Sequence, residues 1–221
     1  MNAVTTIEQA RFNMIEQQIR PWDVLDPAVL TLLAVVKRED FVPAAHRALA
    51  FMDLEVPLDG GQVMLAPRVE ARLVQELAPG RHEKVLEIGT GSGHVAALLA
   101  HRAQSVVTLE KRPALASAAR AALQRAAVHN VEVRDADGAQ AAAVAGPWDA
   151  ILLSGSVAEL PRALLQQLKV GGRLVGVVGQ EPVMRAVRVT RHGESDFRTE
   201  ELFDTVVPRL DGFPEPRAFR F

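Results

Sequence analysis

The sequence predicts an α/β fold of the doubly wound kind, in which helices cover both faces of a mostly parallel sheet. Three observations lead to this prediction. Apolar strand-like segments alternate with helical segments from residue 67 onward, a glycine-rich turn joins one strand to the next helix, and helical spacing dominates residues 1–60. Alternating strands and helices form a parallel sheet that is buried on both faces. Its crossovers should be right-handed.

The composition is that of a globular chain without a basic surface. The 221 residues are 48% hydrophobic and carry a formal net charge of −2, which gives no field to hold nucleic acid or anionic lipid. There are no cysteines, so disulfides and thiolate metal sites are excluded, and the histidines lack metal-ligand spacing. Residues 1–20 have no signal-peptide core. We expect a cytoplasmic protein without a metal, a membrane or a nucleic acid as partner.

Residues 1–60 are expected to form a helical extension that packs on a core of residues 61–221, as one structural unit. Apolar residues at helical spacing predict a first helix from Thr6 to Ile19. Asp26-Pro27 predicts the start of a second helix, because Asp caps free N–H groups and Pro suits the first turn. Lys37-Arg38 is expected at a helix C-terminus, where it complements the dipole.

The remaining elements follow from periodicity and from the positions of glycine and proline. Helices are predicted at 67–78, 92–102, 113–127 and 161–168, and strands at 84–88, 105–110, 131–134, 148–153 and 173–178. Two further strands, at 183–191 and 197–206, should close the sheet as a hairpin. This order is Rossmann-like, and in such sheets ligands bind beyond the carboxyl ends of the strands at the switch point.

A glycine-rich turn follows the strand 84–88 and reads Gly89-Thr90-Gly91-Ser92-Gly93, with Glu87 just before it. The glycines remove every Cβ that could block a ligand, and the next helix begins with free N–H groups. The turn alone fits a nicotinamide nucleotide as well. However, an acid beside N–H donors suits the ammonium and carboxylate of S-adenosylmethionine better than a pyrophosphate.

Acidic residues end the next two strands. Glu110 could accept hydrogen bonds from both ribose hydroxyls, and Asp137 could accept one from the adenine amino group, with Asp135 as the alternative. Together with Glu87 they form a set that is more specific than the turn alone. The predicted cofactor-binding residues are Glu87, Gly89, Thr90, Gly91, Ser92, Gly93, His94, Glu110, Lys111, Asp137 and Gly138.

The sequence resembles the protein-L-isoaspartate O-methyltransferases over nearly its whole length. The blocks that carry the resemblance are Met14–Arg20, Val36–Pro43, Val56–Gln62, Val85–Gly93, Trp148–Ile151 and Leu168–Val175. The N-terminal blocks discriminate best, because most class I methyltransferases share the glycine turn. The resemblance implies that the turn, Glu110 and Asp137-Gly138 bind S-adenosylmethionine, with S-adenosylhomocysteine as product. It also implies that the acceptor is the carboxylate of an L-isoaspartyl residue in a damaged protein.

Departures from the family pattern fall where the acceptor should bind. The family usually continues its Gly-Gln with Thr-Ile-Ser-Gln-Pro-Tyr, and its Ser is usually taken as the active-site residue. Here Val63 and Leu65 stand at the Thr and Ser positions, and Arg68 replaces the Tyr. The catalytic residue is therefore open, with Arg68 and Gln62 as candidates.

These departures leave several functions open. A carboxylate acceptor is ionised at pH 7 and needs orientation rather than a base. Val63 and Leu65 cannot donate hydrogen bonds, whereas Arg68 either pairs with an acidic substrate or is a solvated arginine at a helix start. The acceptor is then an isoaspartyl protein or peptide, or a small acid, and a non-catalytic S-adenosylmethionine-binding homologue is a further alternative. We expect a monomer or weak dimer.

Overall fold

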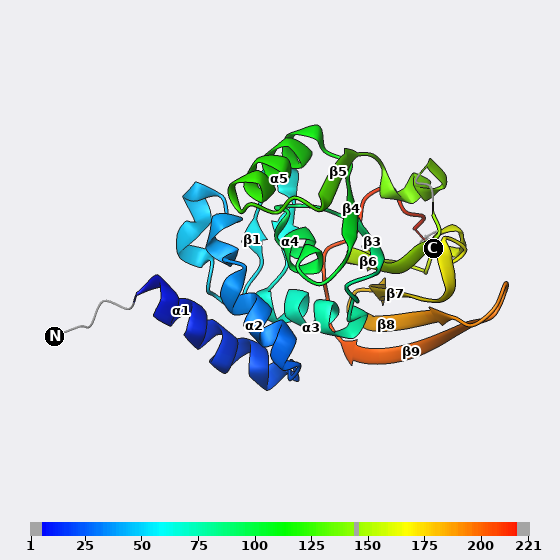
Figure 1. The fold of residues 1–221 in the computed structure, drawn as a ribbon, viewed down its shortest axis with the longest axis horizontal. Helices are drawn as coiled ribbons and strands as arrows, with labels where there is room; N and C mark the ends of the chain where they lie inside the picture. The colour runs from blue at the N-terminus through cyan, green and yellow to red at the C-terminus, as the bar shows by residue number, and fades with distance from the viewer. Residues whose placement is uncertain (1–5, 144–145, 216–221) are drawn as a thin grey trace, which may run out of the picture.

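A seven-stranded sheet forms the centre of the structure, a computed structural model that describes residues 6–143 and 146–215 (Figure 1). The strand order is β5-β4-β3-β6-β7-β8-β9. The five strands β3, β4, β5, β6 and β7 are mutually parallel, whereas β8 and β9 run antiparallel to their neighbours. The predicted fold class and closing hairpin are confirmed. The strands are β3 (Lys84–Ile88), β4 (Ser105–Glu110), β5 (Val131–Asp135), β6 (Trp148–Val157), β7 (Leu168–Gln180), β8 (Val183–Arg191) and β9 (Phe197–Asp204).

The sheet reverses its direction of growth between β3 and β6. The chain first adds β4 and β5 on one side of β3, then returns to place β6 on the other side, where Ile88 pairs with Leu153. The loops that leave β3 and β6 therefore diverge at their carboxyl ends and open a crevice.

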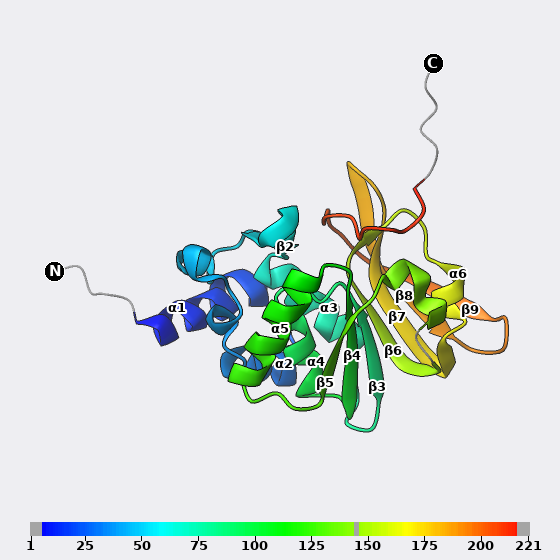
Figure 2. The same ribbon diagram turned by 90° about the horizontal axis from the view of Figure 1, so that it is seen from above.

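Two apolar cores lie on the two faces of the sheet, because successive strand residues point to opposite faces. Val85 belongs to the larger core, and its neighbour Leu86 belongs to the smaller one. The larger core is covered by α3 (Pro67–Leu77), α4 (His94–Ala100) and α5 (Pro113–Arg125). The smaller core is covered by α6 (Arg162–Leu165) and by the C-terminal segment, which includes the buried Phe213 (Figure 2).

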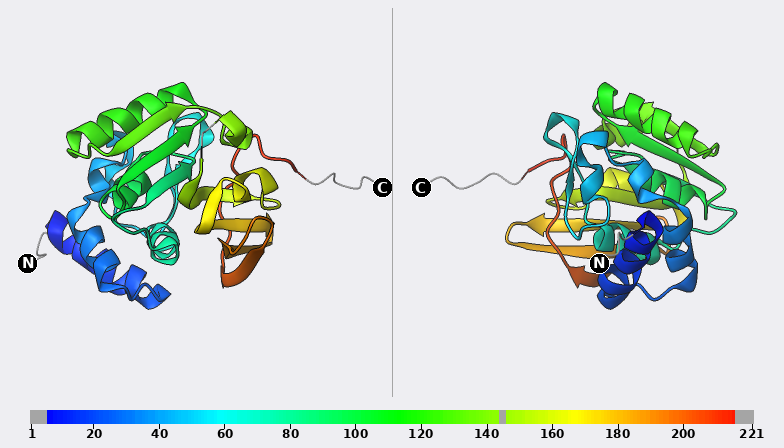
Figure 3. Two further views of the ribbon diagram at one scale, coloured as in Figure 1. Left: turned by 45° about the vertical axis from the view of Figure 1, so that its right-hand side comes forward. Right: turned by 90° about the vertical axis from the view of Figure 1, so that its left-hand side faces the viewer.

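The N-terminal helices extend the helical layer that covers the larger core (Figure 3). The Thr6 side chain accepts from the N–H of Gln9 at 3.1 Å, and that of Asp26 accepts from Ala28 at 2.8 Å. Both predicted helix starts are thus confirmed. The elements are α1 (Ile7–Met14), a π-helical turn (Ile15–Ile19), α2 (Pro27–Val35) and 3-10 turns at Arg20–Trp22, Arg38–Asp40, Ala44–Leu49 and Asp59–Gly61.

A small antiparallel hairpin joins the extension to the core. Strand β1 (Val56–Pro57) pairs with β2 (Val63–Met64), so backbone hydrogen bonds cross the boundary predicted at residue 60. Ile19 and Phe41 lie in the same apolar cluster as Val85. The division into a helical extension of residues 1–60 and a core of residues 61–221 therefore stays a proposal.

Some predicted boundaries were wrong. The helix predicted at 161–168 covers only Arg162–Leu165. The backbone N–H of Trp148 donates to the carbonyl of Gln167 at 2.7 Å, and Leu168 already pairs with Trp148 in the sheet. Strand β7 therefore starts earlier than predicted, at Leu168. Helix α4 starts at His94 because Gly93 belongs to the turn, with φ +85°. Within the described residues, no helix combines the length and hydropathy needed to cross a membrane.

Candidate active site

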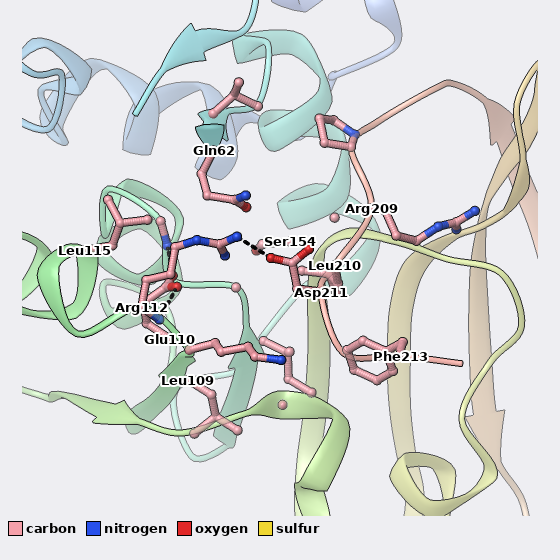
Figure 4. A pocket seen from close by; sticks show the side chains of 18 of the residues that line it. Gln62, Leu109, Glu110, Arg112, Leu115, Ser154, Arg209, Leu210, Asp211 and Phe213 are labelled. Atoms are coloured by element: carbon pink, nitrogen blue, oxygen red, sulfur yellow. Dashed lines mark hydrogen bonds and ion pairs between the residues drawn. The ribbon is translucent and has the colours of Figure 1, made fainter. Parts of the chain in front are cut away.

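A cavity lies at the switch point, at the carboxyl ends of β3 and β4 and beside Ser154 and Gly155 of β6 (Figure 4). Gly89 and Gly91 line it from the glycine turn, and Glu110 lines it from the end of β4. The loop Gln62–Leu65 and the C-terminal segment Pro208–Phe213 contribute the other walls. Segments far apart in the sequence therefore meet where the fold predicts a ligand site.

The glycine turn is anchored to β4 and needs glycine at three positions. Gly89, Gly91 and Gly93 have φ of +95°, +52° and +85°, a backbone conformation that side-chain-bearing residues rarely adopt. The N–H groups of Gly89 and Thr90 donate to the carbonyl of Leu109 at 3.0 and 3.2 Å. The turn is thus held against the strand that carries Glu110.

Glu110 is fixed by backbone donors on both sides. Its Oε2 accepts from the N–H of Gly91 at 2.9 Å, and its Oε1 accepts from the N–H of Arg112 at 3.0 Å. The side chain is buried, yet it lines the cavity. Each carboxylate oxygen keeps lone pairs that can accept hydrogen bonds from a ligand.

Asp137 and Lys111 form an ion pair beside the cavity, with Nζ 2.8 Å from Oδ2. The hydrogen bond from Lys111, together with one from the N–H of Ala139, outweighs burial and lowers the pKa of Asp137. Lys111 and Gly138 line the cavity. Asp135, the alternative, is half exposed and pairs with Arg120 at 2.7 Å. The structure therefore brings the Asp137 pair, rather than Asp135, to the edge of the cavity.

Glu87 lies fully buried beneath the turn. The hydroxyls of Thr108 and Ser154 each donate to its carboxylate at 2.7 Å. Burial raises its pKa to about 8, against the lowering effect of these hydrogen bonds and with help from the nearby Glu70 and Glu110 carboxylates. A neutral carboxyl is thus favoured until a cation comes close.

The acceptor wall, defined as Gln62–Leu65, faces the turn across the cavity. Val63 and Leu65 line this cavity and also a smaller adjoining one, which Glu87 and Ser154 share. Figure 4 shows Gln62 directed into the cavity. The hydroxyl of Ser154 was missed by sequence reasoning, since a single serine within a strand gives no signal of its own.

Arg68 points elsewhere. Its guanidinium pairs with Asp53 and lies 4.6 Å from the centroid of the Trp22 ring. Arg68 is not among the residues that line the described cavity. A direct role of Arg68 in acceptor binding stays a hypothesis that substitution can test.

His94 turns away from the cavity. Its Nδ1 lies 2.8 Å from Glu70 Oε2, and its ring packs on Phe41 with centroids 5.4 Å apart. Arg38 also pairs with Glu70 and is only 2% exposed. The prediction that Lys37-Arg38 merely ends a helix was therefore wrong for Arg38, because it lies in a 3-10 turn that folds into the core.

The C-terminal segment closes the cavity from the side of β6. Leu210 packs on the turn, so that a Cβ built on Gly89 would lie 2.8 Å from Leu210 Cδ2. Arg112 and Asp211 form an ion pair across the opening (Figure 4). The cavity is partly open to solvent and has a volume of about 60 Å³. Among the described residues, no cluster of three or more His, Asp or Glu side chains is arranged to hold a metal ion.

Comparison with known proteins identifies a methyltransferase family. The family model described as Protein-L-isoaspartate(D-aspartate) O-methyltransferase (PCMT) matches residues 9–208. Protein-L-isoaspartate O-methyltransferase 1 of Rhodopseudomonas palustris (strain HaA2) is 41% identical, over 98% of this chain and 91% of the relative. Protein-L-isoaspartate O-methyltransferase 2 of Pelobacter propionicus is 40% identical, over 88% and 87%.

A solved structure shares the fold at lower identity. A Plasmodium falciparum protein, described as a candidate protein-L-isoaspartate O-methyltransferase in complex with S-adenosyl-L-homocysteine, aligns with a TM-score of 0.79. It is 19% identical, and the alignment covers 90% of this chain and 97% of the other. The family match spans both the N-terminal helices and the glycine turn. The chain belongs to the protein-L-isoaspartate(D-aspartate) O-methyltransferase family.

Proposed function

We propose that this protein transfers the methyl group of S-adenosylmethionine to the carboxylate of L-isoaspartyl residues in damaged proteins. Family membership supports the reaction class and the methyl donor. The observation that carries the proposal is the cavity in which the glycine turn and Glu110 face the acceptor wall. A cofactor and a carboxylate acceptor can meet there.

The residues of the cavity fit S-adenosylmethionine. The turn offers backbone without Cβ atoms, Glu110 can accept from the ribose hydroxyls, and Asp137 can accept from the adenine amino group. The buried acid Glu87 suits the methionine ammonium. Ligand pockets usually measure about 300–1,000 Å³, and we propose that the C-terminal segment with Leu210 shifts to widen this smaller cavity when the cofactor binds.

The acceptor needs positioning rather than deprotonation. A free carboxylate is ionised at pH 7, so its oxygen is ready to attack the sulfonium methyl once it lies in line with the carbon–sulfur bond. Val63 and Leu65 exclude water from this end of the cavity but donate no hydrogen bond. We propose that the Gln62 carboxamide orients the acceptor instead.

Labelled methyl transfer to an L-isoaspartyl peptide tests the proposal. The natural protein should methylate it, and the variant Val63→Thr with Leu65→Ser should be faster, by up to about 10²-fold if the added donors act on the acceptor. A peptide with ordinary aspartate is the control. Absence of transfer by the natural protein, while S-adenosylhomocysteine still binds, would refute the proposal.

A different acceptor is the second candidate, because Val63 and Leu65 leave the wall without hydroxyl donors. In that case the natural protein binds the cofactor, and only the hydroxyl-bearing variant methylates the isoaspartyl peptide. A non-catalytic cofactor-binding homologue would methylate no acceptor, protein or small acid. We further propose a cytoplasmic monomer or weak dimer whose partners include neither nucleic acid nor membrane, in keeping with its net charge of −2.

A further inference from the structure

Three buried polar side chains form a cluster between the N-terminal extension and the core, and one of them, Glu70, lines the smaller adjoining cavity. Arg38, Glu70 and His94 are 2%, 3% and 2% exposed. Arg38 Nη1 pairs with Glu70 Oε2, and His94 Nδ1 lies 2.8 Å from the same oxygen. We call these residues the buried triad. It connects a 3-10 turn, α3 and the first residue of α4.

The charges of the triad are stabilised by one another. Burial acts to raise the pKa of Glu70, but the Arg38 guanidinium and the His94 imidazole lower it, so the net pKa lies below its usual value. The carboxylate therefore stays ionised and paired. A buried ion pair often stabilises a fold no better than apolar side chains of similar volume. Stability alone thus gives a weak account of why charges stand here.

The triad reaches the acceptor wall through one hydrogen bond. Arg38 Nη2 donates to the backbone carbonyl of Leu65 at 2.7 Å. Strand β2 ends at Met64, so the β1–β2 pairing does not include Leu65. Ala66, the next residue, caps α3 without a side-chain hydrogen bond. The Arg38 donor therefore anchors the wall where the hairpin has ended.

The same triad also contacts the cofactor side. His94 follows Gly93 directly and begins the helix behind the glycine turn. The guanidinium thus lies between the backbone of the acceptor wall and the side chain that follows the turn. A shift of about 1 Å between reacting groups can cost about 10² in rate, so this link matters for an in-line transfer.

We propose that Arg38 is a positioning residue for methyl transfer: held by Glu70 and His94, its guanidinium fixes the Leu65 carbonyl and so sets the acceptor wall against the glycine turn. This inference rests on the proposed function for its kinetic test. The positioning of the wall can also be measured without any activity.

The experiment compares two double variants that each replace a buried ion pair by apolar side chains. Arg38→Met with Glu70→Leu removes the anchor. Arg11→Met with Glu39→Leu removes a matched pair, whose side chains are 9% and 10% exposed and whose hydrogen bonds reach neither wall nor turn. Each variant is studied by hydrogen exchange of the backbone amides of residues 63–66, by S-adenosylhomocysteine affinity, and by KM and kcat for the isoaspartyl peptide.

We expect the Arg38 double variant to exchange the amides of the wall at least about tenfold faster, and to show an increased KM and a decreased kcat for the peptide. Its affinity for S-adenosylhomocysteine should fall by a smaller factor than its kcat/KM for the peptide, because the glycine turn and Glu110 are left in place. The Arg11 variant should change none of these values. Equal changes in both variants, or an unchanged wall in the Arg38 variant, would overturn the inference.

A single substitution keeps the test decisive if the double variant does not fold. Arg38→Lys retains a charge for Glu70, but a compact ammonium cannot also replace the second arm of the guanidinium at Leu65. Faster exchange of the wall is again expected, and unchanged exchange contradicts the inference. If the natural protein methylates no isoaspartyl peptide, the proposed function fails, while the exchange measurements still decide whether Arg38 positions the wall.

Discussion

The cofactor side and the acceptor side of the cavity are built in different ways. The cofactor side consists of one continuous turn and of strand-end residues, and backbone hydrogen bonds fix its carboxylate, Glu110, in place. The acceptor side combines Gln62–Leu65 with Pro208–Phe213, two segments far apart in the sequence. Backbone hydrogen bonds to Leu58 and Ser156 and side-chain contacts of Arg38 and Arg112 hold these segments in place. One side is thus built mainly on consecutive strand ends of the central sheet, and the other is assembled from two segments that lie far apart in the sequence. Substitutions should have sharper and more local effects on the cofactor side.

The largest effect is expected for Gly89→Ala. Its φ of +95° disfavours any Cβ, and the new methyl group would meet Leu210 and intrude on the cofactor space. We expect S-adenosylhomocysteine affinity, measured by calorimetry, to fall by at least about 10²-fold, in line with several kcal/mol of strain and lost contact.

Gly171→Ala is the matched control. Gly171 has φ +84°, but an added Cβ would meet nothing within 4 Å. The control should lose about 1–2 kcal/mol of unfolding free energy and bind the cofactor normally. Similar affinity losses in the two variants would show that backbone strain, rather than the geometry of the turn, governs binding.

Glu110→Gln should have the next largest effect. The amide loses the charge that accepts ribose hydrogen bonds and can no longer accept from the N–H groups of both Gly91 and Arg112. Hydrogen bonds to charged groups contribute about 1.5–3 kcal/mol, so affinity should fall by about 10- to 100-fold. Asp135→Asn, at the next strand end, should leave affinity unchanged. An equal loss of affinity in Asp135→Asn would contradict the assignment of the ribose hydroxyls to Glu110.

On the cofactor side, Glu87 should make the stability of the protein depend on pH. Its pKa of about 8 in the folded protein exceeds the value of 4.5 expected when unfolded, so the folded state holds the proton more tightly. The contribution of protonated Glu87 to the free energy of unfolding is therefore complete below about pH 4.5, and it is lost as pH rises through 8. The melting temperature without cofactor should therefore fall between pH 5 and 8, and Glu87→Gln should flatten that slope. A parallel slope in the variant would mean that other groups cause it.

The smallest effect is expected for Arg68→Ala. Its guanidinium pairs with the partly exposed Asp53 and stacks on Trp22, which together contribute about 1 kcal/mol of stability. Peptide KM and kcat should stay within about twofold, and Asp53→Ala should destabilise the protein to a similar extent. A tenfold loss of turnover in Arg68→Ala alone would instead support the hypothesis that Arg68 binds the acceptor.

Many elements of the fold were predictable because their signals are local. Thr6 and Asp26 start helices through hydrogen bonds to residues two or three positions away. The strands at 84–88 and 105–110 were predicted with the bounds that the structure gives them. The helix predicted at 161–168 was too long because Gln166-Gln167 contains no glycine or proline to mark a helix end. The pairing of Leu168 in the sheet overrides its local helix propensity.

The sheet, the glycine turn and the acids at successive strand ends could be predicted from the sequence alone, because parallel strands bring their carboxyl ends to one edge whatever else packs around them. The contacts between side chains of distant segments became known from the folded structure and not from the sequence. Glu70 lies 32 residues from Arg38, and Asp211 lies 99 residues from Arg112. Periodicity tells which face a residue occupies, but not which residue of another segment meets it there. For that reason Arg68, conspicuous in the sequence, lies on Asp53, whereas Arg38 holds the acceptor wall.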